Sequence, residues 1–395
     1  MSNLMREFPP AGEDQVTLAN WRNAPFSSWA FSHVREIIQT ADIPNNPEDI
    51  WRLQSDPSDL AGLPVDSGLN LNGYLDATYT DAFMVIHQGR VIAEEYRNAA
   101  GARIPHILMS VSKSMLGALS GILADKGILD TAAQVTDYVP EIAGTAWKGA
   151  TVQNLLDMRT GIRFDEDYEA ISGAIIEYRK STGWNPLEPG EDASDLRSFF
   201  NEISDTDGPH QGRFHYVSPN TDLMAWIIER AAGTRYADLM STHLWRPMGA
   251  ETSAYITVDR LGAPRAAGGM CVTLRDLARV GLLVANRGKR GSDQVLPEAW
   301  VDDVMNNGDP QAWAEGDFAA YFPGRNMHYR NKWYVERGDN PMVFCIGIHG
   351  QNLYVLPEQQ LVVAKMSSRP APLDPEVSLL NLKMLSALKQ HFGEK

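Results

Sequence analysis

The chain has few cysteines and no long hydrophobic run. Its two cysteines, Cys271 and Cys345, are far apart in a sequence of 395 residues, each within an apolar stretch. Two such residues cannot form the disulfide framework of a small secreted protein, so we expect buried free thiols. No apolar stretch is long enough to span a bilayer, and residues 1–16 lack the apolar segment of a secretory signal. These features predict a cytoplasmic protein.

An excess of positive charge is also absent. Fifty aspartates and glutamates outnumber 35 lysines and arginines, which gives a formal net charge of -15. Binding of nucleic acid or of an anionic membrane needs a basic face, so neither is an expected partner. With 44% hydrophobic and 22% charged residues, the composition is typical of a globular enzyme. The length fits one body with an inserted region better than two independent domains.

Several catalytic motifs are missing as well. The sequence has no Gly-x-Ser-x-Gly elbow, no His-Glu-x-x-His, and no cysteine–histidine cluster at metal-binding spacing. No glycine-rich loop that could hold a phosphate precedes a predicted helix. We therefore expect neither a metal ion nor an organic cofactor.

A serine and a lysine lie three residues apart at the predicted start of a helix. The run from Ser110 to Lys113 reads Ser-Val-Ser-Lys, and residues at this spacing share one helix face. The Lys113 amine can then reach the Ser110 hydroxyl, which is a poor nucleophile until a base takes its proton. Apolar neighbours should desolvate Lys113 and lower its pKa. Such a pair is expected about once by chance in a chain of this length, so it needs support from other motifs.

The order of predicted elements indicates one antiparallel sheet built from both ends of the chain. Strands are predicted at 80–86 and 90–96, then a helix from Ser110 that Gly127 ends, and later strands at 342–349, 352–355 and 361–366 before a helix at 375–391. We predict an α/β (α+β) fold in three parts. An N-terminal arm (1–76) wraps an α/β body (77–130 and 255–395), and a mainly helical region (131–254) is inserted into the body.

Taken together, these features resemble the serine β-lactamase and penicillin-binding-protein superfamily, in its class C-like form. That superfamily combines a Ser-x-x-Lys motif with a second motif in the helical region and a third on a core strand. The second motif here is Tyr-Val-Ser at 216–218. Within the superfamily the chain is most similar to the 6-aminohexanoate-dimer hydrolases and related carboxylesterases. This similarity extends from about Trp21 onward and includes the segments 79–83, 108–114, 166–168, 220–222 and 347–352.

The resemblance implies a β-lactamase/DD-peptidase-like fold and specific catalytic roles. Ser110 would be the nucleophile, Lys113 its base, and Tyr216 the carrier of a proton to the leaving group. A phenol beside an ammonium should have a lowered pKa, which suits Tyr216 for this role. The Lys-Thr-Gly strand of the superfamily is replaced by Gly-Ile-His at 347–349. The backbone N–H groups of Ser110 and Ile348 would form the oxyanion hole.

Candidate substrate-binding residues come from aromatic side chains and from the strand motif. The aromatic ones can equally be plain core residues. An amide with a free ammonium end needs an acidic partner, but the stretch 177–180 is mostly basic, and an alanine stands where a polar side chain could hold the substrate. The candidates are Tyr168, Trp184, Ala267, Tyr334 and His349.

We therefore predict a cofactor-independent serine hydrolase that acts through an acyl-enzyme on a small linear amide or ester. The alternatives are a class C-like carboxylesterase or β-lactamase, a DD-peptidase, and a catalytically silent ligand-sensing module. The missing strand lysine, which would hold a substrate carboxylate, counts against β-lactamase and DD-peptidase activity. No segment indicates an oligomer interface, although a homodimer remains open.

Overall fold

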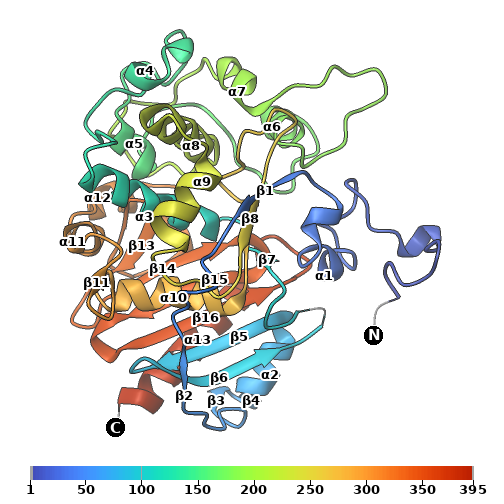
Figure 1. The fold of residues 1–395 in the computed structure, drawn as a ribbon, viewed down its shortest axis with the longest axis vertical. Coiled ribbons are helices and arrows are strands. Elements are labelled where there is room, and N and C mark those ends of the chain that lie inside the picture. The colour runs from blue at the N-terminus through green and yellow to red at the C-terminus, as the bar shows by residue number, and fades with distance from the viewer. Residues whose placement is uncertain (1–2, 99, 394–395) are drawn as a thin grey trace.

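The computed structural model describes residues 3–98 and 100–393. An eight-stranded sheet has the order β12-β13-β14-β15-β16-β5-β6-β2 and joins late strands to early ones (Figure 1). All neighbours are antiparallel except β2 and β6, which are parallel. Its strands are β2 (Gln54–Ser55), β5 (Thr80–His87), β6 (Arg90–Tyr96), β12 (Met327–Arg330), β13 (Trp333–Glu336), β14 (Met342–Gly347), β15 (Gln351–Leu356) and β16 (Leu361–Ser367).

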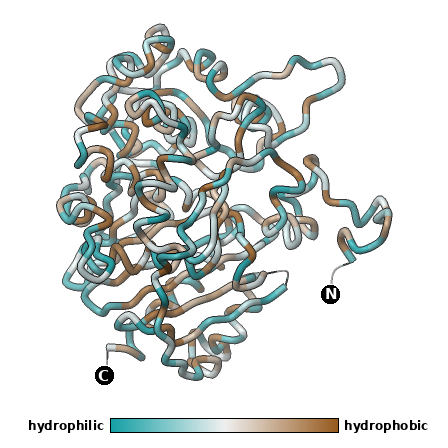
Figure 2. The backbone as a smooth tube through the Cα atoms, viewed as in Figure 1, coloured by the Kyte–Doolittle hydropathy of each residue, from teal (hydrophilic) through white to brown (hydrophobic). Residues whose placement is uncertain are grey.

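The central strands of this sheet are buried on both faces. Met84 and Ile86 of β5 pack into one core with residues of α3 (Val111–Asp125) and α10 (Leu274–Ala285). Phe83 and Val85 point to the other core, which α2 (Leu71–Ala77) and α13 (Pro375–Gly393) cover. A strand between two cores is a continuous hydrophobic run, as the brown stretches along the sheet in Figure 2 show. The predicted early hairpin, late strands and final helix are confirmed.

Residues 131–253 contain only helices and loops apart from isolated bridges. The longest helix, α8 (Pro219–Ala232), starts with proline in its first turn and ends at Gly233, whose φ of 63° is left-handed. Glycine adopts this conformation without strain and is therefore a frequent helix terminator. The other helices are α4 (Val135–Tyr138), η3 (Pro140–Ile142), α5 (Val152–Leu156), α6 (Ala174–Ser181), α7 (Leu196–Phe199), η4 (Phe200–Glu202), α9 (Tyr236–Met240) and η5 (Ser241–Trp245).

The first 76 residues, predicted to form an arm that wraps the body, contain several short strands and helices. Besides β2, the strand β1 (Thr40–Ile43) forms the edge of a second sheet of order β1-β8-β9-β7. These strands have two to four residues, too few for an alternating pattern to be distinctive in the sequence. The division into arm, body and insert stays a prediction. The arm and second sheet add η1 (Gly12–Asp14), α1 (Ser27–Ala30), η2 (Val34–Glu36), β3 (Pro64–Asp66), β4 (Leu69–Asn70), β7 (His106–Ile107), β8 (Ala254–Thr257) and β9 (Met270–Val272).

The hairpin of β12 and β13 packs on α3, the helix that begins at Ser110. The sequence analysis does not predict this hairpin. Its turn consists of Asn331 and Lys332, both with positive φ, and lies against α3 where a Cβ on Gly117 would come within 2.2 Å of the Asn331 carbonyl. Both cysteines are buried and free, as predicted. In the described ranges no helix has the length and apolar character needed to cross a membrane. The remaining elements are β10 (Lys289–Arg290), β11 (Asp293–Gln294), α11 (Glu298–Asn306), α12 (Pro310–Ala314), η6 (Ala319–Tyr321), η7 (Ile348–Gly350) and η8 (Pro357–Gln359).

Candidate active site

Ser110 lies at the N-terminus of α3, beside the end of a core strand. It is the N-cap residue of the helix and is half-buried. Met109 before it has a φ of 46°, a left-handed conformation that costs a non-glycine residue about 1–3 kcal/mol and often occurs at functional sites. A Cβ on Gly347, the last residue of β14, would lie 3.0 Å from the Ser110 nitrogen. The close approach requires glycine there and brings Ile348 beside Ser110.

Lys113 reaches Ser110, as the three-residue spacing predicts. Its Nζ donates to Ser110 Oγ at 2.9 Å and to the Ala267 carbonyl at 2.7 Å. The side chain is buried, and this burial lowers the Lys113 pKa to about 7, although the nearby Glu166 carboxylate acts in the opposite direction. A neutral Lys113 amine, with a lone pair that can accept a proton, is therefore accessible near pH 7.

Ala267 is itself held through its backbone N–H by a buried carboxylate. Asp222, in the first turns of α8, accepts the Ala267 N–H at 2.7 Å. It also accepts hydrogen bonds from the Tyr178 hydroxyl and the Arg265 guanidinium. Asp222 thereby fixes the backbone that positions Lys113. The segment 220–222 carries part of the family resemblance, but the sequence assigns Asp222 no role, because its partners lie more than 40 residues away in either direction.

Tyr216 completes the group around Ser110, but its pKa is shifted the opposite way from our prediction. Lys113 Nζ lies 4.9 Å from the centroid of the buried Tyr216 ring. The Ser110 hydroxyl favours the phenolate, yet burial and the Glu166 carboxylate outweigh it and raise the Tyr216 pKa above its ordinary value. The expected lowering is wrong because burial disfavours the charged forms of both groups. Tyr216 is therefore a neutral phenol, which can donate a proton.

A second carboxylate, Glu166, connects the loop at 165–168 to the segment that carries Tyr216. It accepts hydrogen bonds from both the backbone N–H and the hydroxyl of Ser218, and the Tyr168 hydroxyl donates to it at 3.2 Å. The sequence analysis includes this loop in the resemblance without giving Glu166 a role. One acid among several in a polar loop carries no signal of a partner 52 residues away.

The predicted pocket residues occupy different environments. Tyr334 is buried, and its hydroxyl favours a lower pKa of the Tyr216 phenol. Tyr168 is half-buried, whereas Trp184 is buried with its indole N–H on the Thr257 hydroxyl at 3.0 Å. Ala267 contributes its carbonyl group rather than its side chain. Their roles in substrate binding stay predictions.

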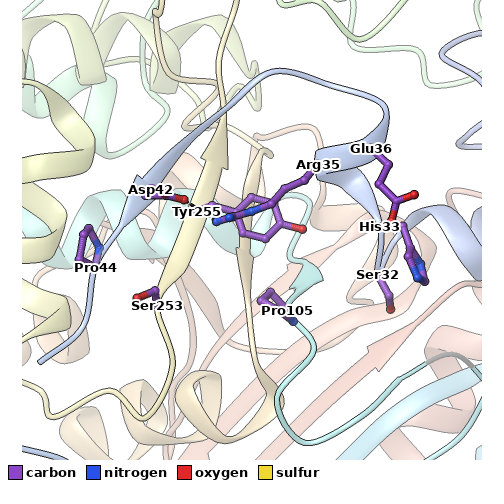
Figure 3. Close-up of a pocket in the computed structure, with 9 residues that line it drawn as sticks. All are labelled: Ser32, His33, Arg35, Glu36, Asp42, Pro44, Pro105, Ser253 and Tyr255. Atoms are coloured by element: carbon purple, nitrogen blue, oxygen red, sulfur yellow. Dashed lines mark hydrogen bonds and ion pairs between the residues drawn. The ribbon is translucent and has the colours of Figure 1, made fainter. Parts of the chain in front are cut away.

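His349, in the strand motif, points to backbone rather than to Ser110. Its Nδ1 lies 2.7 Å from the Arg369 carbonyl, and burial lowers its pKa to about 4, so the imidazole is neutral near pH 7. A cavity of about 390 Å³ lies elsewhere, between the arm and β8, and none of the predicted site residues lines it (Figure 3). Within the described residues no three or more His, Cys, Asp or Glu side chains are placed to hold a metal ion.

The fold and this arrangement define a serine hydrolase of the β-lactamase class. Residues 73–387 match the family described as Beta-lactamase, and the chain belongs to that family. The predicted fold class and family are thereby confirmed.

Among individual proteins, the chain is 37% identical to a 6-aminohexanoate-dimer hydrolase from Paenarthrobacter ureafaciens over 370 residues. The match covers 92% of this chain and 91% of the relative. A solved structure described as "Putative 6-aminohexanoate-dimer hydrolase from Bacillus anthracis" superposes with a TM-score of 0.87 at 26% identity, covering 96% of this chain and 98% of that chain. A family VIII carboxylesterase shares the fold, with a TM-score of 0.57 at 15% identity over 78% of this chain and 91% of that chain.

Proposed function

We propose that the protein hydrolyses small linear amides or esters through an acyl-enzyme on Ser110. The observation that carries this proposal is the buried Lys113 amine, 2.9 Å from Ser110 Oγ with a pKa of about 7. A hydroxyl with an adjacent base that is neutral at working pH is an activated nucleophile.

In the acylation step Ser110 Oγ attacks the substrate carbonyl while its proton moves to Lys113 Nζ. The backbone N–H groups of Ser110 and Ile348 stabilise the oxyanion that forms. Support for this pair comes from the close packing of Gly347 on the Ser110 nitrogen. The Ala267 carbonyl accepts a hydrogen bond from the Lys113 ammonium and so favours its formation.

Collapse of the tetrahedral intermediate requires a proton on the leaving nitrogen or oxygen. Tyr216, a neutral phenol, donates this proton and regains one from the Lys113 ammonium, so that the serine proton ends on the leaving group. Water then attacks the ester on Ser110 and releases the acid. Support for this proton path comes from the Lys113 amine beside the Tyr216 ring and from the hydrogen bond between the Tyr216 and Ser110 hydroxyls.

The proposed substrates are short linear amides of the 6-aminohexanoate dimer kind, as the relative with 37% identity suggests. Simple esters are the second candidate, because Glu177, the acid that could bind an ammonium end, is paired with Lys180 at 3.2 Å. A panel of the dimer, short-chain 4-nitrophenyl esters, D-alanyl peptides and nitrocefin tests the proposal. Turnover confined to nitrocefin or D-alanyl peptides would contradict it. The cytoplasmic location and a homodimer stay predictions.

The pH dependence of kcat/KM should report the protonation of Lys113. The base acts only when neutral, so kcat/KM for 4-nitrophenyl butyrate should fall as the pH drops through about 7 and level off above that value. The measurement is a pH–rate profile on the free enzyme with stability monitored in parallel. A rate that stays flat down to about pH 5, where only carboxylates begin to titrate, would contradict the assignment of Lys113 as the base.

Replacing Tyr216 by phenylalanine should affect amides more than activated esters. We expect kcat to fall about 10²–10³-fold on an amide, because the leaving amine must be protonated, and less on 4-nitrophenyl butyrate, whose leaving group departs as an anion. Steady-state kinetics on both substrates, with the melting temperature as a control for folding, checks this. Equal losses on both substrates would show that Tyr216 does not act as the proton donor.

A further inference from the structure

An arginine of the N-terminal arm lies beside the site without a carboxylate partner. Arg22 forms no ion pair with any described residue, and its guanidinium donates instead to the side-chain oxygen of Asn185. It is half-buried, where an arginine normally has a carboxylate or another acceptor of full charge. Among the described residues, no carboxylate therefore balances the charge of Arg22.

The position of Arg22 is fixed by the residue before it. The Trp21 indole N–H donates to the Trp184 carbonyl at 3.2 Å, and the two rings meet edge-on with centroids 5.1 Å apart. Trp184 in turn lies 3.0 Å from where a Cβ on Gly268 would be, next to the residue whose carbonyl holds Lys113. Trp21 and Trp184 also belong to one apolar cluster with Met109, and Ile348 packs on it. The cluster thus contacts the chain beside both proposed oxyanion donors.

The charges around Arg22 leave a local positive excess in an otherwise acidic protein. Arg179 and Arg265 both lower the Arg22 pKa, which burial and these two cations bring down to about 9. Arg265 is neutralised by Asp222. Arg179 donates to the carbonyls of Asp167 and Tyr168, and the Glu166 carboxylate favours its charged form, which leaves Arg22 as the third cation of the group. The charge of Arg22 also contributes to the lowered pKa of His349, next to Ile348. An anion bound at this point would relieve the repulsion.

We propose that Arg22 binds the free carboxylate of a linear amide or ester substrate beside Ser110. The arm would then supply the cation that the 347–349 strand lacks, since no Lys-Thr-Gly lysine is present there. This inference rests on the proposed function and adds a substrate class to it: acyl or leaving groups that carry a carboxylate. A guanidinium can donate two parallel N–H hydrogen bonds to the two oxygens of a carboxylate.

The test compares substrates that differ only in charge. One pair is the 6-aminohexanoate dimer and its C-terminal carboxamide; the other is mono-4-nitrophenyl adipate and 4-nitrophenyl hexanoate. With Arg22→Gln we expect kcat/KM to fall about tenfold for the carboxylate member of at least one pair, mainly through KM, as loss of a charged hydrogen bond predicts. The neutral member should change less than about twofold. An effect on the dimer pair places Arg22 at the leaving group, and an effect on the adipate pair places it at the acyl group.

A second variant keeps the arginine and its packing. Asn185→Asp replaces the amide that accepts the Arg22 hydrogen bond by a carboxylate. The new ion pair should lower the preference for carboxylate substrates without removing the arginine. The control is Arg35→Gln in the same arm, because Arg35 already pairs with Asp42 at 2.6 Å and lies over the Tyr255 ring (Figure 3). Its carboxylate preference should equal that of the wild type.

Binding without turnover separates this inference from the proposed function. The Kd values of 6-acetamidohexanoate and 6-acetamidohexanamide, measured by calorimetry on Ser110→Ala protein, should differ in favour of the carboxylate, and Arg22→Gln should abolish the difference. A wild-type enzyme that cleaves neither substrate pair would contradict the proposed function, whereas this Kd difference would still test Arg22. Preferences that are equal in wild type, Arg22→Gln and Asn185→Asp would overturn the inference.

Discussion

Replacing Ser110 by alanine should reduce kcat/KM for 4-nitrophenyl butyrate by at least about 10⁴-fold. The alanine variant has no oxygen to form the acyl-enzyme, so only the weak stabilisation by the oxyanion hole is left. Ser110 is half-buried and its side chain makes no cap hydrogen bond to the helix N-terminus, so the melting temperature should change little. Steady-state kinetics and thermal unfolding on the purified variant check both expectations.

The same helix offers a matched control. Ser120 is buried in α3 and its hydroxyl donates to the Leu116 carbonyl one turn earlier. Ser120→Ala removes an oxygen from the same helix without touching Ser110, Lys113 or Tyr216, and its activity should stay within about twofold of wild type. An Ser110→Ala enzyme that keeps a tenth or more of the activity would show that another residue is the nucleophile.

The second large effect is expected for Lys113→Met. Methionine fills the apolar space of the lysine stem but cannot accept the Ser110 proton, so we expect a loss of about 10³-fold or more in the rate of acylation. The buried site loses a group that is costly to charge, and the fold should therefore stay intact. Burst-phase kinetics with a 4-nitrophenyl ester measure acylation directly, and circular dichroism reports the fold.

A second buried serine–lysine pair provides the control for Lys113. Lys365 Nζ donates to Ser367 Oγ at 2.7 Å, and burial together with the nearby Arg369 lowers the Lys365 pKa to about 7. Ser367 is fully buried, so no substrate can reach it. Lys365→Met should leave the acylation rate within about threefold of wild type. If Lys365→Met and Lys113→Met cause equal losses, the effect of Lys113 is structural and its role as base is wrong.

The local part of the site can be predicted from sequence because it depends on one helical turn. The spacing of Ser110 and Lys113 on α3 fixes their contact, and apolar neighbours fix the direction of the Lys113 pKa shift. The two-faced burial of β5 is likewise visible as a continuous hydrophobic run. These features follow from neighbours within a few residues, for which periodicity and composition are informative.

The rest depends on contacts between distant segments. Asp222 and Glu166 act on groups that lie far away in the chain, and a carboxylate in a helix or loop carries no mark of such a partner. The direction of the Tyr216 pKa shift depends on burial, which the neighbouring ammonium alone does not reveal. The short strand β1 alternates over only four residues, too few to distinguish it from chance, and the turn at Asn331 lacks the glycine that usually marks a hairpin.

The central claim is that Ser110 is the residue that becomes acylated. Its most direct test is intact-mass analysis after treatment with a fluorophosphonate, followed by peptide mapping. We expect one adduct, located on the peptide that contains Ser110, in the wild type and none in Ser110→Ala. An adduct on any other serine, or full inactivation without an adduct on Ser110, would contradict the account.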